Sequence, residues 1–270
     1  MEFLALLMSG LLVGLSPFSF ILEQVSGRQI SQRLQDAESF EVRVDNIPSH
    51  QFIGGKIDRV QIASRGVELV PGLRLAVLEL ETDALNLDLA QLRSGQPGPN
   101  VLREPLQTGM RFVLTEADVN EALRSPRVKT LLQPVINRLL TAPGSTRPER
   151  FQLETATLDF LGNNRFQFMG DISRIDAATG ETEQSTLRLA FTLGLASGSQ
   201  FQWQDLEGSI DDQPLPPPLL SGFAQAFSQR FNLRIFQNRG LTARFLQLDA
   251  DSQELQGAMF IRFTPPEPAS

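Results

Sequence analysis

Acidic residues near the end of the chain are the first candidates for chemistry. The segment 249–254, Asp-Ala-Asp-Ser-Gln-Glu, begins with the carboxylate spacing of a calcium-binding loop. Its sixth position is Glu254, where such loops need a glycine, and its twelfth is Phe260, where they need a carboxylate. We therefore expect solvated charges on a hairpin here and no metal site.

The residues required by common catalytic mechanisms are largely missing. The chain has no cysteine, which excludes disulfides, thiolate catalysis and cysteine-based metal sites. Its single histidine, His50, follows Ile-Pro-Ser, which is typical of a turn, so a surface histidine is expected rather than a general base. Glu79 and Glu81 lie two apart on an expected strand and share its solvent-exposed face. No nucleophile elbow, P-loop or dinucleotide fingerprint occurs. These absences predict a protein that is not an enzyme and needs no cofactor.

Composition indicates a folded chain that does not bind nucleic acid. Apolar residues make up 41% of the 270 residues, which is enough for a sizeable core. The net charge of −7 and the pI of about 4.9 argue against the basic face of a nucleic-acid binder. The nineteen phenylalanines fit either an ordinary core or a surface that meets acyl chains.

A hydrophobic segment precedes the rest of the chain. Residues 3–22 carry no charge, and a helix of that length could just span a bilayer core of roughly 30 Å. The run is unlike a secretory signal, because an acidic residue precedes it, Pro17 interrupts it and no A-x-A site follows. We expect residues 1–22 to meet a membrane as an anchor, a degenerate signal or an interfacial helix, with a core helix as the alternative. Arg28 and Arg33 follow the run, so a positive-inside count conflicts with export.

Residues 23–265 are expected to form one domain, with a flexible loop near 94–103 and a tail at 266–270. Strand patterns dominate it, because apolar and polar residues alternate with a period of two. A change of phase between Val77 and Leu78 predicts a β-bulge. Turn signals separate the strands at 71–72, 162–164 and 197–199, and the last two strands are expected near 241–248 and 255–263.

Amphipathic helices interrupt the strands. Thr115 is the expected N-cap of one helix, Pro126 begins a second, which Pro134 is expected to kink, and the prolines of 214–218 introduce a third. Apolar residues at steps of three and four give the last two helices one apolar stripe each. We predict that these stripes line a lipid-binding groove; they are Leu131, Leu132, Val135, Ile136 and Leu139, and then Leu219, Phe223 and Phe227.

Several segments of the chain resemble the LmeA-like phospholipid-binding family. The more specific ones are Gly-Gly-Lys-Ile-Asp at 54–58 and Leu-Thr-Glu-Ala-Asp at 114–118; weaker ones lie at 42–46, 65–69, 78–83, 160–165 and 221–224. This resemblance implies a lipid-binding protein of the bacterial cell envelope. It also implies a fold similar to the tubular lipid-binding (BPI-like) proteins, and it offers no catalytic motif.

The patterns and the resemblance together predict an α+β, β-dominated fold, with a long curved antiparallel sheet packed around amphipathic helices. If the sheet curls away from the helices, an apolar groove can hold the acyl chains of a phospholipid at a membrane. If the helices fill that space, the chain is instead a structural or partner-binding envelope protein with a filled core and no lipid site. The sequence names no protein partner.

Overall fold

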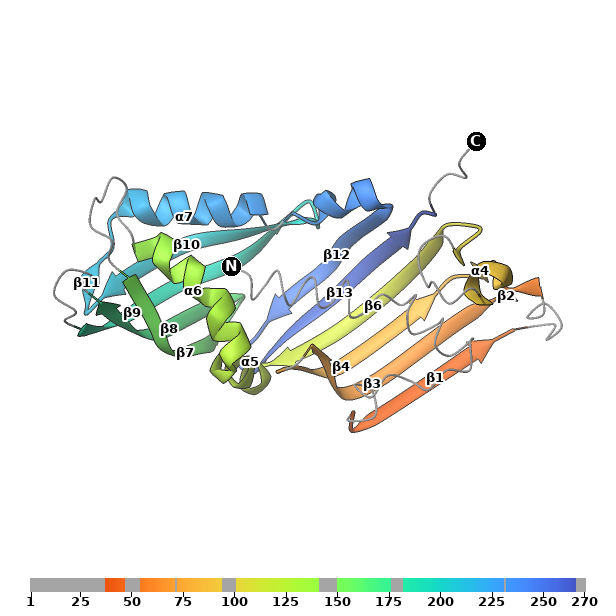
Figure 1. The fold of residues 1–270 in the computed structure, drawn as a ribbon, viewed down its shortest axis with the longest axis horizontal. Helices are drawn as coiled ribbons and strands as arrows, with labels where there is room; N and C mark the ends of the chain where they lie inside the picture. The colour runs from red at the N-terminus through yellow and green to blue at the C-terminus, as the bar shows by residue number, and fades with distance from the viewer. Residues whose placement is uncertain are drawn as a thin grey trace. The chain divides into compact units, whose positions relative to one another are not determined.

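The computed structural model describes residues 37–46, 54–70, 72–93, 101–140, 150–175, 182–230 and 232–265. They divide into two compact units (Figure 1). The described residues of Thr115–Asn232 and Asp249–Leu255 form the helix-covered unit; those up to Leu114, with Leu233–Leu248 and from Gln256 onward, form the six-stranded unit. The predicted α+β, β-dominated class is confirmed, and the sheets are open.

The helix-covered unit is built on an antiparallel five-stranded sheet in which each strand pairs with the next along the chain. Its order is β11 (Gln213–Pro214), β10 (Gln200–Ile210), β9 (Thr182–Ala196), β8 (Arg165–Ile175) and β7 (Arg150–Gly162). The predicted turns at 162–164 and 197–199 are confirmed. Asn163 and Asn164 have φ of 52° and 59°, and Ser197 and Gly198 have φ of 52° and 65°, as tight hairpin turns require.

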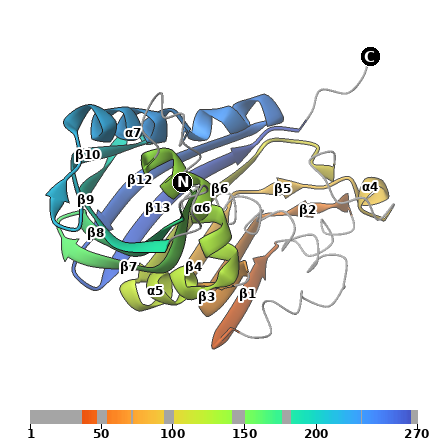
Figure 2. The same cartoon turned by 60° about the vertical axis from the view of Figure 1, so that its left-hand side comes forward.

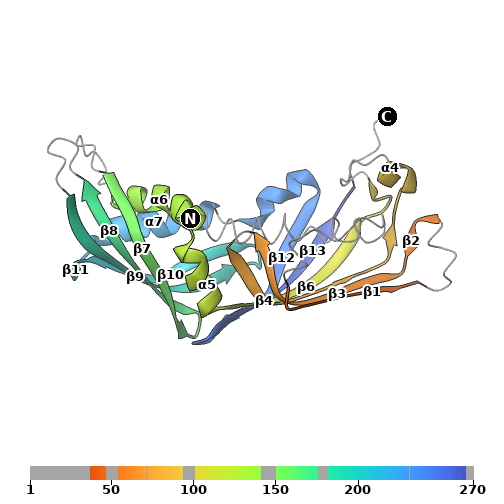
Figure 3. The same ribbon diagram turned by 60° about the horizontal axis from the view of Figure 1, so that its bottom comes forward.

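Three predicted helices pack on one face of this sheet (Figure 3); they are α5 (Glu116–Arg124), α6 (Pro126–Leu140) and α7 (Pro217–Arg230). Thr115 is the N-cap of α5 as predicted, because its hydroxyl accepts a hydrogen bond of 3.1 Å from the backbone N–H of Asp118. Pro134 lies inside α6. None of the described helices is both long and apolar enough to cross a bilayer.

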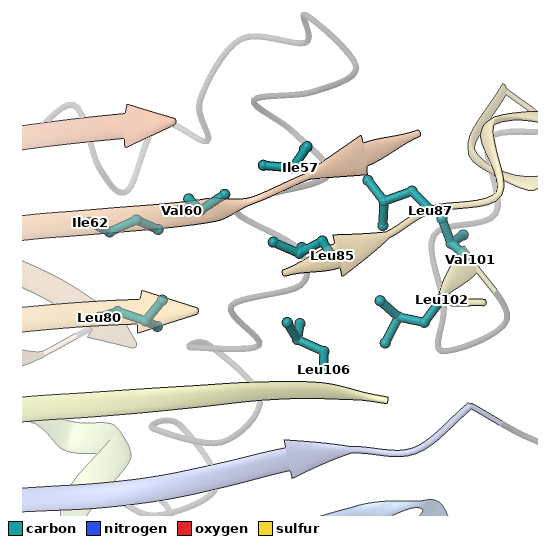
Figure 4. Packing of buried hydrophobic residues seen from close by; sticks show 9 residues of the cluster. All are labelled: Ile57, Val60, Ile62, Leu80, Leu85, Leu87, Val101, Leu102 and Leu106. Carbon is teal, nitrogen blue, oxygen red and sulfur yellow. The ribbon is translucent and has the colours of Figure 1, made fainter. Parts of the chain in front are cut away.

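The six-stranded unit has strands in the order β1 (Ser39–Asp45), β3 (Arg59–Val70), β4 (Leu73–Thr82), β6 (Leu106–Thr115), β13 (Glu254–Phe263) and β12 (Leu241–Ala250). The short strands β2 (Lys56–Ile57) and β5 (Leu85–Asn86) form a separate pair; α4 (Leu89–Arg93) and the 3-10 helix η4 (Leu233–Arg239) complete the unit. A compact apolar cluster packs between the short pair and the large sheet (Figure 4); it comprises Ile57, Val60, Ile62, Leu80, Leu85, Leu87, Val101, Leu102 and Leu106.

The prediction of a β-bulge between Val77 and Leu78 is wrong. Both residues keep regular register with β3 on one side and β6 on the other. The phase of burial changes because the two ends of β4 bury opposite faces, Leu73 and Leu75 on one face and Leu78 and Leu80 on the other. The irregularity in the β3–β4 ladder lies instead between Glu68 and Val70.

Some predictions fall on residues that the structure does not describe. They are the hydrophobic segment 1–22, the turn that carries His50, residues 94–100 of the predicted loop and the tail 266–270. The described end of that loop is buried, since Val101 and Leu102 belong to the apolar cluster.

Candidate functional site

The predicted site residues on α6 and α7 cover one face of the five-stranded sheet. On α6, Leu132 and Ile136 are buried, and on α7 Phe223 and Phe227 are 6% and 1% exposed. Leu219 is half-buried. The side chains of Leu131, Val135 and Leu139 lie outside the described set, although their backbone belongs to α6. The described members of the two predicted stripes thus lie on the helices that pack against this sheet.

A row of aromatic rings runs through the apolar layer between these helices and the sheet, from β7 to α7. Neighbouring rings in the row have centroids 4.3 to 5.6 Å apart, the separation typical of attractive aromatic pairs. Most are stacked, and the first pair meets edge to face. This row is called the aromatic column, and its members are Phe160, Phe166, Phe191, Trp203 and Phe227.

Trp203, the one tryptophan in the chain, is half-buried and contacts three phenylalanine rings. Phe191 stacks on it at 4.4 Å and Phe227 at 4.3 Å, while Phe223 lies tilted at 5.2 Å. The indole Nε1 is buried and finds no hydrogen-bond acceptor among the described residues. The layer therefore contains a buried polar donor whose hydrogen bond is not made within the described structure.

The helices α5 and α6 lie beside β7, at one edge of the sheet (Figure 2). Their side chains form hydrogen bonds with the β7 backbone. The amide of Asn120 donates to Leu158 O at 3.0 Å and accepts from Leu158 N at 2.8 Å. The amide of Gln133 also forms two hydrogen bonds with β7: it accepts from the N–H of Leu153 and donates to the carbonyl of Phe151. Glu116, Lys129 and Asn137 add further bonds along the strand. These side chains form hydrogen bonds with the backbone N–H and carbonyl groups that an edge strand otherwise presents to another chain.

The opposite edge is open beside Trp203. The two-residue strand β11 pairs only with Ser209 and Ile210 of β10. At the other end, Gln200 bridges to Asn232 and its side chain donates to the carbonyl of Ser228 in α7. Between these points no strand of the described chain pairs with the outer edge of β10. A β-bulge between Gln204 and Glu207 follows Trp203 directly, and bulges are common where a strand re-aims side chains beside a site.

The aromatic column contains no side chain that could act as an acid, a base or a metal ligand. None of the five rings ionises in the physiological range. Among the described residues, no three His, Cys, Asp or Glu side chains gather closely enough to hold a metal ion. The arrangement is suited to burying apolar groups and to donating one hydrogen bond.

Three carboxyl groups with lowered pKa values lie between elements: Asp88 directly precedes α4, Asp211 lies between β10 and β11, and Asp251 lies between β12 and β13. The pKa of Asp88 is lowered chiefly by the backbone N–H of Gln91, that of Asp211 by the N–H of Thr186 and that of Asp251 by the N–H of Glu254. Asp251 lies in the β12–β13 hairpin, so the predicted hairpin at 249–254 is confirmed. Each of these carboxylates accepts backbone hydrogen bonds, a structural role.

A hollow lies on the six-stranded sheet. It is an open depression of about 570 Å³ whose lining includes Gly109 and Ala63. Two of its three acidic side chains have partners: Glu79 pairs with Arg111 at 3.3 Å, and Glu81 accepts from Gln61 at 3.1 Å. Mutual pairing of these charges makes the depression a weaker candidate than the apolar layer.

The sequence prediction missed Trp203 and the side chains that close the β7 edge. Phe201 and Trp203 alternate with polar residues, which indicates a strand but not that it stacks under a helix. The polar residues Gln133 and Asn137 stand four apart and therefore share one face of α6, which was a usable sign of a polar contact along that face.

Comparison with known proteins identifies the family of the chain. No curated protein sequence matches the chain. The family model described as LmeA-like phospholipid-binding matches residues 13–258, which include all the described elements except the end of β13. The chain therefore belongs to the LmeA-like phospholipid-binding family.

Proposed function

We propose that this protein binds phospholipid without catalysing a reaction on it, with acyl chains lying in the apolar layer beneath α6 and α7. Membership of a phospholipid-binding family supports the class of ligand. The observation that supports the location is the contact of the predicted α7 residues Phe223 and Phe227 with Trp203 of the aromatic column.

The two edges of the sheet suggest how a lipid enters. Along β7, side chains from α5 and α6 already occupy the backbone groups, so parting these elements would break several hydrogen bonds. Along β10 beside Trp203, the described residues offer no such barrier. An acyl chain would therefore enter between α7 and β10 beside Trp203, between the Gln200–Ser228 hydrogen bond at one end and the Leu215–Gly208 hydrogen bond at the other.

The free energy of acyl burial is large enough for useful affinity. Each methylene removed from water contributes about 0.8 kcal/mol, so a chain of ~16 carbons gains on the order of 10 kcal/mol before ordering costs. Opening the layer breaks ring contacts, each worth about 0.5–1.5 kcal/mol beyond burial, and the acyl chain replaces part of that contact.

We also propose that residues 1–22 bring the protein to a membrane, because the run 3–22 is uncharged and long enough to enter the apolar region. Removing residues 1–22 is expected to shift the protein from the membrane fraction to the supernatant after centrifugation. A full-length protein found wholly in the supernatant at low salt without detergent would contradict this role.

The test of the acyl site is a thermal melt combined with binding of a fluorescent phosphatidylcholine, applied to Phe223→Asp. If Phe223 lines an openable groove, water reaches the new carboxylate, so the fold survives and lipid affinity falls at least tenfold. Leu161→Asp is the matched control, because Leu161 is 49% exposed on the same sheet, and it is expected to retain both properties.

Two outcomes would count against the proposal. In a permanently filled core, Phe223→Asp buries an unpaired carboxylate and lowers the melting temperature sharply, which favours the structural or partner-binding alternative. The close ring spacing around Trp203 is the observation in favour of that alternative. A folded variant with undiminished binding would place the lipid elsewhere.

A further inference from the structure

We propose that the indole N–H of Trp203 donates a hydrogen bond to an ester carbonyl of the bound phospholipid. This inference rests on the proposed function and identifies the ligand group that the layer recognises.

The first argument is the unmade hydrogen bond. Trp203 Nε1 is buried and has no acceptor among the described residues. A buried donor without a partner destabilises the folded protein, and the great majority of buried polar groups in proteins are paired. A phenylalanine at this position could stack between the same rings without that penalty, so the indole is costly unless an acceptor arrives with a ligand.

The second argument is the direction from which an acceptor can come. Phe191 and Phe227 both stack on the indole, so the edge of the ring is the part that a ligand meets most readily. The nitrogen lies on that edge, and Trp203 belongs to the part of β10 that no described strand pairs with on its outer side. A molecule that enters along this part of β10 therefore comes to the residue that carries the donor.

The third argument is the chemistry of the acceptor. The surroundings of the indole are phenyl rings, and a charged phosphate moved among them would lose its hydration without a counter-charge. An ester carbonyl is an uncharged oxygen acceptor and is joined directly to the acyl chain. When the acyl chain lies in the apolar layer, the ester group is the polar part of the lipid that can stay closest to the layer.

The test compares two ligands and two proteins. Full-length protein and the Trp203→Phe variant are titrated with a diester phosphatidylcholine and with its diether analogue, which has the same chains and headgroup but no carbonyl. Native mass spectrometry measures the bound fraction. The wild-type protein is expected to prefer the diester about 3- to 10-fold, the value of one net neutral hydrogen bond. The Trp203→Phe variant is expected to bind both lipids with equal affinity.

A second readout uses the wild-type protein alone. Because the chain has one tryptophan, its ¹H–¹⁵N spectrum contains a single indole signal. Diester lipid is expected to move that proton downfield and diether lipid to leave it nearly in place. This measurement decides the question even if Trp203→Phe weakens the fold.

Each other outcome overturns a distinct statement. Equal binding of both lipids by the wild-type protein, or a diester preference that persists in Trp203→Phe, rejects the hydrogen bond while leaving lipid binding in place. If neither lipid binds the wild-type protein, the proposed function itself fails and the inference fails with it.

Discussion

Glycine residues decide how closely side chains can pack in the six-stranded unit. The buried ring of Phe112 lies directly over Gly257 of β13, where any added methyl group would overlap the ring. Phe112 also meets Phe245 edge to face, with centroids 6.3 Å apart. The missing side chain at Gly257 is therefore part of the packing around the ring.

Replacing Gly257 by alanine is expected to destabilise the protein by about 1–3 kcal/mol, the usual cost of overpacking a well-filled core. The measurement is the urea midpoint. Gly109→Ala is the matched control, because Gly109 lies on the neighbouring strand β6 and its added methyl would meet only the carbonyl oxygen of Glu81 at 4.0 Å. Equal midpoints for the two variants would show that the ring moves aside at no cost.

The pKa of the Asp251 carboxyl group should lie below its usual value of 3.8, because the backbone N–H groups of Glu254 and Gln253 donate to it at 2.9 and 2.7 Å. A pKa that is lower in the folded state stabilises the protein above the unfolded pKa. This contribution is lost as the pH falls through the folded pKa. Carboxyl ¹³C titration by NMR measures the shift, and a folded pKa at or above 3.8 would contradict the hairpin contacts.

At the scale of elements, the helix-covered unit depends on polar side chains that close the β7 edge. Asn120 joins α5 to both backbone groups of Leu158. Asn120→Ala leaves these part-buried groups without that partner, so a loss of about 1–3 kcal/mol in unfolding free energy is expected.

The adjacent substitution Glu121→Ala provides the comparison for Asn120→Ala. Glu121 forms a surface ion pair with Arg124 at 3.0 Å, and both side chains are largely exposed. Its removal should change stability by no more than about 0.5 kcal/mol. Similar losses for the two variants in urea unfolding would show that the contact to Leu158 carries no special weight.

The elements themselves were largely predictable from local sequence. Thr115, Pro126 and Pro217 mark helix starts because capping and proline geometry act within one turn, and Asn163-Asn164 marks a hairpin for the same local reason. The position of the irregularity in β3–β4 was not predictable. Alternation reports which face is buried, and in β4 that face changes along a strand of regular register.

At the scale of the whole molecule, the sequence predicted which helices carry apolar stripes but not what those stripes meet. The burial of Ile136 and Phe227 follows from periodicity. The stacking of Trp203 between Phe191 and Phe227 depends on β9, β10 and α7 coming together, which no local pattern encodes. For the same reason, only the folded structure shows that the buried indole nitrogen has no hydrogen-bond acceptor among the described residues.

The central claim, that acyl chains lie in the layer beside Trp203, can be tested through the fluorescence of that one tryptophan. Full-length protein is incubated with phosphatidylcholine brominated at mid-chain, then separated from vesicles by gel filtration so that only retained lipid remains. Bromine quenches indole emission only at close approach. We predict strong quenching that unbrominated lipid reverses and that Leu161→Asp leaves unchanged. Retained brominated lipid with undiminished Trp203 emission would contradict the claim.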